Sequence, residues 1–194
     1  YKEAHGYDQD FFELLTDLTE TISIGTTKTA DIVSSLRMYA RQKSGLEEEI
    51  DINRSIKTAI KILKHKMLDP RSVQLNLDEK RPLIMGNEGR ISQVFLNMIG
   101  NAMDAAGDRG EVVVTTQLIQ ESSQLQVEIK DNGEGIPHEI QHKIFDPFFT
   151  TKEVGEGTGL GLSISRSIIE EHQGELSYDT DSNGTIFTIL FPLC

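Results

Sequence analysis

A stripe of short polar side chains on one predicted helix has the composition of a metal-binding surface. The spacing of apolar residues predicts a helix from about Glu88 to Ala106 of this 194-residue chain. Its polar residues recur every three or four positions and so share one face: Arg90, Gln93, Asn97, Asn101, Asp104 and Asp108. Asn97 and Asn101 lie one turn apart, and their carbonyl oxygens suit Mg²⁺ that also binds phosphates. The alternative is an ordinary polar surface helix.

The segment Asp131–Pro137 (Asp-Asn-Gly-Glu-Gly-Ile-Pro) directly follows a predicted strand. Asp-Asn-Gly by itself is a common turn sequence. The second glycine, Gly135, indicates more than a turn, because glycine lets a flat ligand approach the backbone. A carboxylate at the end of a strand, here Asp131, can accept a hydrogen bond from an exocyclic amine.

A second glycine-rich segment, residues 155–163 (Gly-Glu-Gly-Thr-Gly-Leu-Gly-Leu-Ser), runs into a predicted helix. Its alternating glycines expose backbone amides at a helix N-terminus, where the helix dipole favours phosphate. The segment lacks the Gly-Lys-Ser/Thr ending of a Walker loop and does not fit Gly-x-Gly-x-x-Gly. The alternative, a flexible linker, does not explain why an amphipathic helix follows at once.

The loop between the two glycine segments contains Phe145-Asp146-Pro147-Phe148-Phe149-Thr150-Thr151-Lys152. Its phenylalanines can anchor a loop to the core, which is the simpler interpretation. Lys152 stands just before the glycines and can reach phosphates as a point charge. A glycine-flanked loop with an aromatic hinge is also typical of a lid over a ligand.

The remaining elements predict an antiparallel-rich sheet covered on one face by helices. Apolar residues from Phe11 to Tyr39 alternate spacings of four and three, which predicts a long helix, Asp8 to Lys43, with a heptad seam. The seam favours a partner helix, from another chain or from missing sequence, over packing on its own domain. Asp51 is expected to cap a second helix. Strands are predicted at 72–77, 83–85, 112–118, 125–129, 175–179 and 185–191, and helices at 138–144 and 160–172.

Composition excludes several classes of protein. The 31 acidic residues outnumber the 19 basic ones, giving a net charge of −12, so we expect no nucleic-acid partner. No apolar stretch is long enough to span a membrane, so no membrane contact is expected within this chain. A single cysteine, Cys194, cannot form an internal disulfide and fits a reducing compartment.

In this order the motifs resemble those of the ATP-binding domain of sensor histidine kinases, within the GHKL superfamily (gyrase, Hsp90, histidine kinase, MutL). Residues 93–102 look like the asparagine box, 131–137 and 157–163 like the two glycine boxes, and 145–152 like the phenylalanine box. Gly184-Thr185 with Phe187 and Pro192 resembles the closing strand, and residues 25–41 the second helix of the dimerisation hairpin. The resemblance implies an α+β fold, a two-layer α/β sandwich with a mixed sheet, preceded by a long coiled-coil-type helix. Residues 1–48 would then be a partial dimerisation segment, and residues 49–194 the catalytic ATP-binding domain.

The resemblance also implies a role for each matching residue. Asn101 would coordinate Mg²⁺, assisted by Asn97, and Asp104 would lie within reach of ligand or metal. Asp131 would bind the adenine amine, with Gly133, Gly135, Ile136 and Thr185 forming the rest of the adenine site. Thr150, Thr151 and Lys152 would belong to the lid. The phosphates would be wrapped by Gly157, Thr158, Gly159, Leu160, Gly161 and Leu162.

Two departures from the superfamily matter. ATP-hydrolysing members have a glutamate four residues before the metal asparagine, whereas this chain has Asn97, which cannot act as a general base. Asn97 and Lys152 are therefore expected to position and stabilise the transferring phosphate. The phosphoacceptor histidine is also missing, because His5, in Ala-His-Gly-Tyr, does not resemble that site. We expect the histidine to lie upstream, outside this fragment.

The expected function is transfer of the ATP γ-phosphate to that histidine, for relay to an aspartate of a response regulator. ATP and Mg²⁺ are the expected cofactors, a receiver domain and a second copy of the chain the expected partners, and the cytoplasm the expected location. Two alternatives remain: a GHKL ATPase that drives a clamp, and a non-catalytic nucleotide-sensing scaffold.

The sequence also contains a literal zinc-protease pattern, His138-Glu139-Ile140-Gln141-His142. The predicted helix is too short to anchor a catalytic metal, since it begins after Pro137 and stops before Asp146-Pro147. We expect both histidines at the surface.

Overall fold

The computed structural model describes residues 11–16, 18–19, 21–22, 25–26, 47–63, 73–107, 110–152 and 157–194. The chain divides into two compact units. One comprises residues 1–43 and 150–158, and the other residues 44–149 and 159–194. The larger unit contains all the strands assigned within the described residues.

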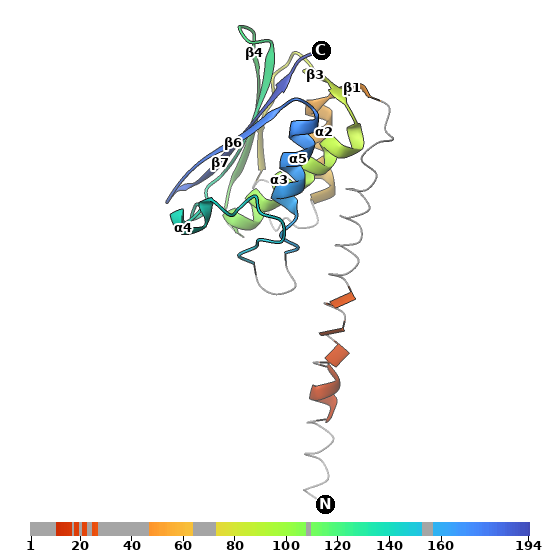
Figure 1. The fold of residues 1–194 in the computed structure, drawn as a ribbon, viewed down its shortest axis with the longest axis vertical. Coiled ribbons are helices and arrows are strands. Elements are labelled where there is room, and N and C mark those ends of the chain that lie inside the picture. The colour runs from red at the N-terminus through yellow and green to blue at the C-terminus, as the bar shows by residue number, and fades with distance from the viewer. Residues whose placement is uncertain are drawn as a thin grey trace, which may run out of the picture. The chain divides into compact units, whose positions relative to one another are not determined.

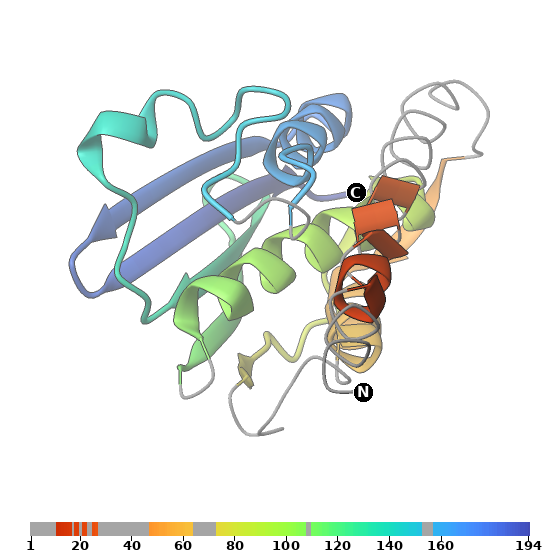
Figure 2. The same ribbon diagram turned by 90° about the horizontal axis from the view of Figure 1, so that it is seen from below.

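The larger unit is a two-layer sandwich of one sheet and one layer of helices (Figures 1 and 2). The five-stranded sheet has the spatial order β2 (Val73–Asn76), β4 (Val112–Ile119), β5 (Gln124–Asp131), β7 (Gly184–Pro192) and β6 (Glu175–Asp181). Strand β2 runs parallel to β4, and every other neighbouring pair is antiparallel. The predicted α+β class with a mixed sheet is therefore confirmed.

Three helices lie on one face of this sheet: α2 (Ile52–Leu63), α3 (Glu88–Ala106) and α5 (Gly161–Glu171). A four-residue helix, α4 (His138–Gln141), lies between the two glycine segments. A separate two-stranded sheet pairs β1 (Glu48–Asp51) with β3 (Leu83–Gly86) in antiparallel fashion. Strand β1 was not predicted, and α4 is shorter than the predicted helix 138–144 because the residues that follow form turns.

The core lies between the two layers because residues alternate along the strands and recur along α3. Alternate residues of β5, of β7 and of β4 as far as Thr116 are buried, because one side of each strand faces the helices. The apolar face of α3 is buried against them: Ile91, Val94, Phe95, Met98, Ile99 and Ala102. Full burial of one such large side chain contributes roughly 1.5–3 kcal/mol. Burial of this face leaves the polar stripe of α3 on its other side.

Side-chain caps fix where the helices begin. The Asn87 side chain accepts a hydrogen bond from the Arg90 amide at the start of α3 (3.0 Å). Asp51 accepts one from the Arg54 amide at the start of α2 (3.1 Å), as predicted for its cap. Each cap satisfies an amide that the helix itself leaves unpaired.

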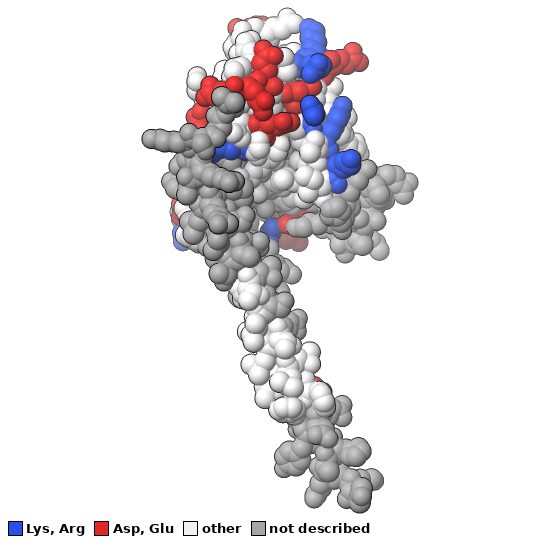
Figure 3. All heavy atoms as spheres, turned by 90° about the vertical axis from the view of Figure 1, so that its right-hand side faces the viewer, with Lys and Arg blue, Asp and Glu red and all other residues white. Residues whose placement is uncertain are grey.

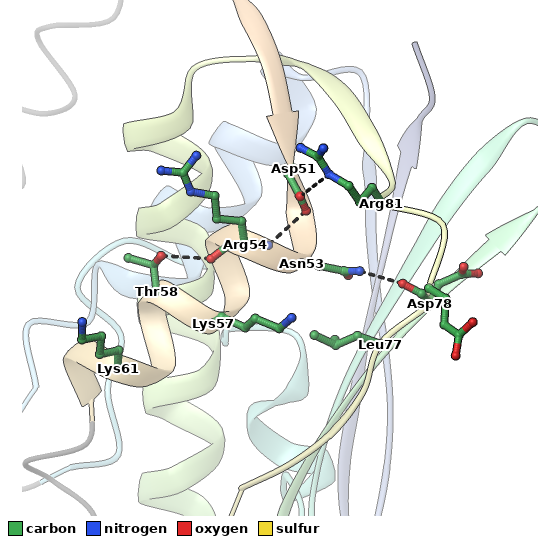
Figure 4. Close-up of a pocket in the computed structure, with 10 residues that line it drawn as sticks. Asp51, Asn53, Arg54, Lys57, Thr58, Lys61, Leu77, Asp78 and Arg81 are labelled. Atoms are coloured by element: carbon green, nitrogen blue, oxygen red, sulfur yellow. Dashed lines mark hydrogen bonds and ion pairs between the residues drawn. The ribbon is translucent and has the colours of Figure 1, made fainter.

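A polar network ties α2 to the sheet, and Figure 4 shows the contact between Asn53 and Asp78 that belongs to it. Asn53 donates a hydrogen bond to the Asp78 carbonyl (2.8 Å) and accepts one from the Thr116 hydroxyl (2.9 Å). The Thr116 hydroxyl in turn accepts one from the Asp78 amide (2.9 Å). This closed triangle joins a helix, a loop and β4, so it sets the position of α2 on the sheet.

Charged side chains are unevenly distributed over the surface of the larger unit. Figure 3 shows acidic and basic side chains in adjoining areas of one face. Basic side chains of α2 and of the loop at residues 77–81 border a hollow of about 630 Å³: Arg54, Lys57, Lys61 and Arg81 (Figure 4). This hollow contains none of the predicted site residues.

The smaller unit includes part of the predicted long helix. The described residues between 11 and 26 are helical, and the rest of the predicted span to Lys43 lies outside the described residues. Four residues of the predicted seam are exposed, namely Phe11, Leu15, Leu18 and Ile22. None of the helices in the described ranges is both long and apolar enough to cross a membrane.

Candidate functional site

The middle of the polar stripe of α3 lies against α5. Gln93, Asn97 and Asn101 are half-buried, Asp104 is exposed, and Asp108 lies outside the described residues. Asn97 Nδ2 lies 3.3 Å from the carbonyl oxygen of Gly161 and 3.4 Å from Ser165 Oγ. The stripe is therefore a contact surface, which explains why it is built from short amides instead of lysine and glutamate.

Asn97 and Asn101 both lie against the first residue of α5. A Cβ added to Gly161 would stand 3.8 Å from Asn101 Nδ2 and 3.8 Å from Asn97 Cβ. Leu160, the N-cap residue of α5, makes no capping hydrogen bond with its side chain. Amides at such a helix start carry partial positive charge and bind anions. The structure thus brings the predicted metal asparagines to the predicted phosphate-binding turn.

The loop before α5 is held by a close backbone contact. Gly159 has φ of +66°, and a Cβ on it would overlap the Phe148 backbone. The Phe148 amide donates a hydrogen bond to the Gly159 carbonyl (2.9 Å). Leu160 is buried, while Gly161 and Leu162 are half-buried. Glycine is required at 159 because a side chain fits neither this φ nor this contact.

Asp131 ends β5 with its carboxylate fixed in a buried position. The residue is 2% exposed, and its Oδ1 accepts hydrogen bonds from the amides of Gly133 (2.9 Å) and Thr185 (3.2 Å). Burial raises the pKa of Asp131 above its ordinary value, and the two amide hydrogen bonds oppose that rise. Neither of these two hydrogen bonds involves the other carboxylate oxygen of Asp131, Oδ2. The chain therefore holds a buried carboxylate in one orientation next to Thr185, and its role in binding adenine stays a prediction.

The glycines after Asp131 are required by the protein's own backbone. A Cβ on Gly133 would stand 2.5 Å from the Ala105 carbonyl oxygen. Gly135 has φ of +74°, and a Cβ there would overlap the Asp181 carbonyl. Glycine at both positions thus follows from the fold, whether or not a ligand ring approaches them. Ala105 belongs to α3, so the loop after Asp131 packs against the helix that carries Asn97 and Asn101.

Thr180 belongs to this loop region but was not predicted. Its hydroxyl accepts a hydrogen bond from the Ile136 amide (2.8 Å) and lies 3.0 Å from the Thr185 hydroxyl and 3.2 Å from the Gly184 carbonyl. Thr180 pairs with Thr185 across the β6–β7 hairpin. The strand predicted at 175–179 stopped one residue before Thr180, so the sequence analysis did not include it.

The predicted lid residues belong to the smaller unit. Thr150 and Thr151 are exposed, and the Lys152 amide donates a hydrogen bond to Thr150 Oγ1 (3.2 Å). A Cβ on Gly157 would stand 2.8 Å from that hydroxyl oxygen. Thr158 is half-buried, and residues 153–156 lie outside the described part. The lid role of these residues stays a prediction.

The zinc-protease pattern has no metal site in the described residues. His138 and His142 are both exposed, as predicted. Within the described ranges, no group of three His, Cys, Asp or Glu side chains is arranged to hold a metal ion.

Comparison with known proteins agrees with this geometry. The family described as histidine kinase-, DNA gyrase B- and HSP90-like ATPase matches residues 86–194, which include α3, the Asp131 loop and α5. The chain belongs to this family. Among its relatives, sporulation kinase A of Bacillus subtilis (strain 168) is 34% identical over 164 residues, 83% of this chain. That alignment spans 26% of sporulation kinase A, so the chain covers about a quarter of this longer relative.

Solved structures of histidine kinases are similar to this chain. The catalytic domain of histidine kinase ThkA is 32% identical, with a TM-score of 0.66 over 76% of this chain and 96% of that domain. A structure of ThkA in complex with the response regulator protein TrrA is 26% identical, with a TM-score of 0.68 over 87% of this chain and 49% of ThkA. The larger unit is thus similar to a histidine kinase catalytic domain in fold and sequence.

Proposed function

We propose that this chain is the ATP-binding catalytic region of a sensor histidine kinase, which transfers the ATP γ-phosphate to a histidine outside the segment. One observation carries the proposal: Asn97 and Asn101 lie against Gly161, the first residue of α5. The family match and the ThkA catalytic domain support it. By this proposal residues 49–194 form the catalytic domain, and residues 1–48 part of the dimerisation segment.

The adenine of ATP would bind beside Asp131. Its exocyclic amine would donate to Oδ2, the carboxylate oxygen that the Gly133 and Thr185 amides leave unused. Ile136 is half-buried and held through Thr180, so it would form one wall of the adenine site. The phosphates would meet the amides from Gly159 to Leu162, where the α5 dipole favours negative charge.

The donor set of α3 fits Mg²⁺. Asn101 would supply an oxygen ligand, Asn97 would hold Gly161 in place, and exposed Asp104 would lie one turn beyond. Bound Mg²⁺ neutralises charge on the phosphates.

The metal assignment is tested by measuring the nucleotide Kd with and without Mg²⁺. Mg²⁺ should strengthen nucleotide binding by the unaltered chain, and Asn101→Ala should abolish this effect. An unchanged Mg²⁺ effect would refute the metal assignment.

Transfer to another nucleophile fits this site better than hydrolysis does. Asn97 occupies the position from which a glutamate would activate water, and an amide cannot accept that proton near neutral pH. The chain's contribution is then positioning and charge stabilisation of the transferring phosphate.

The partners follow from the same proposal. A receiver domain of a response regulator would take the phosphate from the histidine, and the structure of ThkA with TrrA supports a partner of this kind. The exposed seam at Phe11, Leu15, Leu18 and Ile22 supports a homodimer formed through the helical segment. The catalytic region would act on the cytoplasmic side.

The deciding experiment measures phosphate release from γ-labelled MgATP, with nucleotide binding checked in the same sample. We expect binding without appreciable release. Steady release that Asn101→Ala abolishes would mean that the chain is an ATPase. Failure to bind would indicate a scaffold. Labelling of an upstream histidine in the longer protein would then test the kinase step directly.

A further inference from the structure

The end of α5 distant from Asn97 is attached to the start of α3 by two side-chain contacts. Arg90 Nη2 lies 2.6 Å from Glu171 Oε2. His172 Nε2 lies 3.1 Å from the amide nitrogen of Asn87, the residue that caps α3. We call Asn87, Arg90, Glu171 and His172 together the α3–α5 clamp.

Both ring nitrogens of His172 are engaged. Nδ1 lies 2.7 Å from the Ile168 carbonyl oxygen, and Nε2 accepts the Asn87 amide hydrogen. A carbonyl can only accept, so Nδ1 carries the hydrogen and the ring is the neutral Nδ1–H tautomer. A Cβ on Gly86, the last residue of β3, would overlap this ring. His172 is therefore an ordered bridge between α5 and the cap of α3, not a surface side chain.

The Arg90–Glu171 pair differs from an ordinary surface ion pair. The two side chains are 21% and 33% exposed, and Arg90 Nε is buried without a hydrogen-bond partner in the described structure. The chain retains this incompletely satisfied guanidinium between the two helices although a buried unpaired donor costs stability. By contrast, Arg166 and Glu170, one turn apart on α5, form an exposed pair within a single helix.

The clamp and Asn97 hold the two ends of α5. Asn97 contacts Gly161 and Ser165 near the N-terminal end of α5, and the clamp holds its C-terminal end. Because α3 and α5 run antiparallel, contacts at both ends fix how far α5 can slide along α3. That register determines where the amides of the first turn of α5 lie relative to Asn97 and Asn101.

We propose that Arg90, Glu171 and His172 are positioning residues for the nucleotide phosphates, acting through the register of α5. The inference rests on the proposed function, since it takes the first turn of α5 as the phosphate site. It predicts a selective effect. Loosening the clamp weakens binding of the phosphates but leaves the adenine site at Asp131 intact, because that site is built on β5 and β7.

The test compares Glu171→Gln with Glu170→Gln, two adjacent residues given the same change. Binding of MgADP and of adenosine is measured for both variants and the unaltered chain. We expect Glu171→Gln to weaken MgADP binding about tenfold, within the usual range for coupling between separate sites. Its affinity for adenosine and all affinities of Glu170→Gln should stay within about twofold of the unaltered chain. Unchanged MgADP binding in Glu171→Gln, or equal losses for both ligands, overturns the proposal.

A second comparison separates positioning from general destabilisation. His172→Gln can still accept from the Asn87 amide and should retain more MgADP affinity than His172→Leu, which cannot. The NMR resonance of the Gly161 amide, recorded without nucleotide, should shift in Glu171→Gln and not in Glu170→Gln. An unaltered chain that binds neither ligand would refute the proposed function and the phosphate role. An unshifted Gly161 resonance would refute the clamp itself.

Discussion

The Oδ1 atom of Asp131 on β5 accepts a hydrogen bond from the amide of Thr185 on the neighbouring strand β7, at 3.2 Å. With the Gly133 amide, this contact holds a buried carboxylate in one orientation. Burial nevertheless raises its pKa, so the hydrogen bonds do not fully offset the loss of water. A buried carboxylate that lowers the stability of the fold is typical of a binding residue.

Asp131→Asn should therefore lose most of the affinity for ATP while the fold survives or gains stability. The asparagine oxygen can still accept from Thr185, but its amide group cannot accept from the adenine amine. Because the folded-state pKa of Asp131 is raised, its ionised form disfavours folding above that pKa, and the variant removes this cost. Calorimetric titration and thermal unfolding measure the two effects. Unchanged ATP affinity would refute the adenine assignment.

Gly135→Ala should destabilise the chain more than Gly107→Ala does. Both glycines have positive φ, +74° and +68°, so alanine strains the backbone in each case by about 1–3 kcal/mol. A Cβ at 135 would also overlap the Asp181 carbonyl, whereas nothing lies within 4 Å of one at 107. Urea unfolding of both variants gives the difference. Equal losses would show that the contact with Asp181 relaxes at no cost.

Asn53→Ala should cost about 2–3 kcal/mol of unfolding free energy, because the Asp78 carbonyl loses its donor and the Thr116 hydroxyl loses the acceptor of its hydrogen. Ser55→Ala is the matched control on the same helix. Ser55 is 1% exposed, but its hydroxyl only bonds back to the Asp51 carbonyl at 3.3 Å. That change should cost under about 1 kcal/mol. Similar losses for both would mean that the network does not hold α2 on the sheet.

Asp78 should make stability depend on pH in the acidic range. Hydrogen bonds from the amides of Lys80 and Leu118 lower its pKa below the ordinary value of about 3.9. Because the pKa of Asp78 is lower in the folded state, its ionised carboxylate stabilises the fold above about pH 4. This stabilisation is lost as the pH falls through the pKa that Asp78 has in the folded state. Asp78→Asn should flatten this part of the stability curve, while Asp179→Asn, an exposed change on β6, should not. A curve that Asp78→Asn leaves unaltered would contradict the assignment.

The sequence predicted the elements well where periodicity was strong. Helix α3 spans the predicted Glu88–Ala106, and the strands of the main sheet lie within one or two residues of their predicted bounds. Strand β1 was missed because Glu48 and Glu49 give no apolar alternation; the strand exists through pairing with β3. Short strands of this kind depend on a partner that is distant in sequence.

Residue types and spacing by themselves determined the fold class, the polar stripe of α3 and the two glycine loops, because these follow from local periodicity and from which side chains can bind metal or phosphate. Only the tertiary structure decided which of them meet. It placed Gly161 against Asn97 and Asn101, turned Asp131 toward Thr185, and assigned Gly133 and Gly135 to backbone contacts. It also revealed Thr180 and the α3–α5 clamp, whose contacts join residues up to 85 positions apart. Such pairs leave no periodic trace, since their proximity comes from packing two layers around one core.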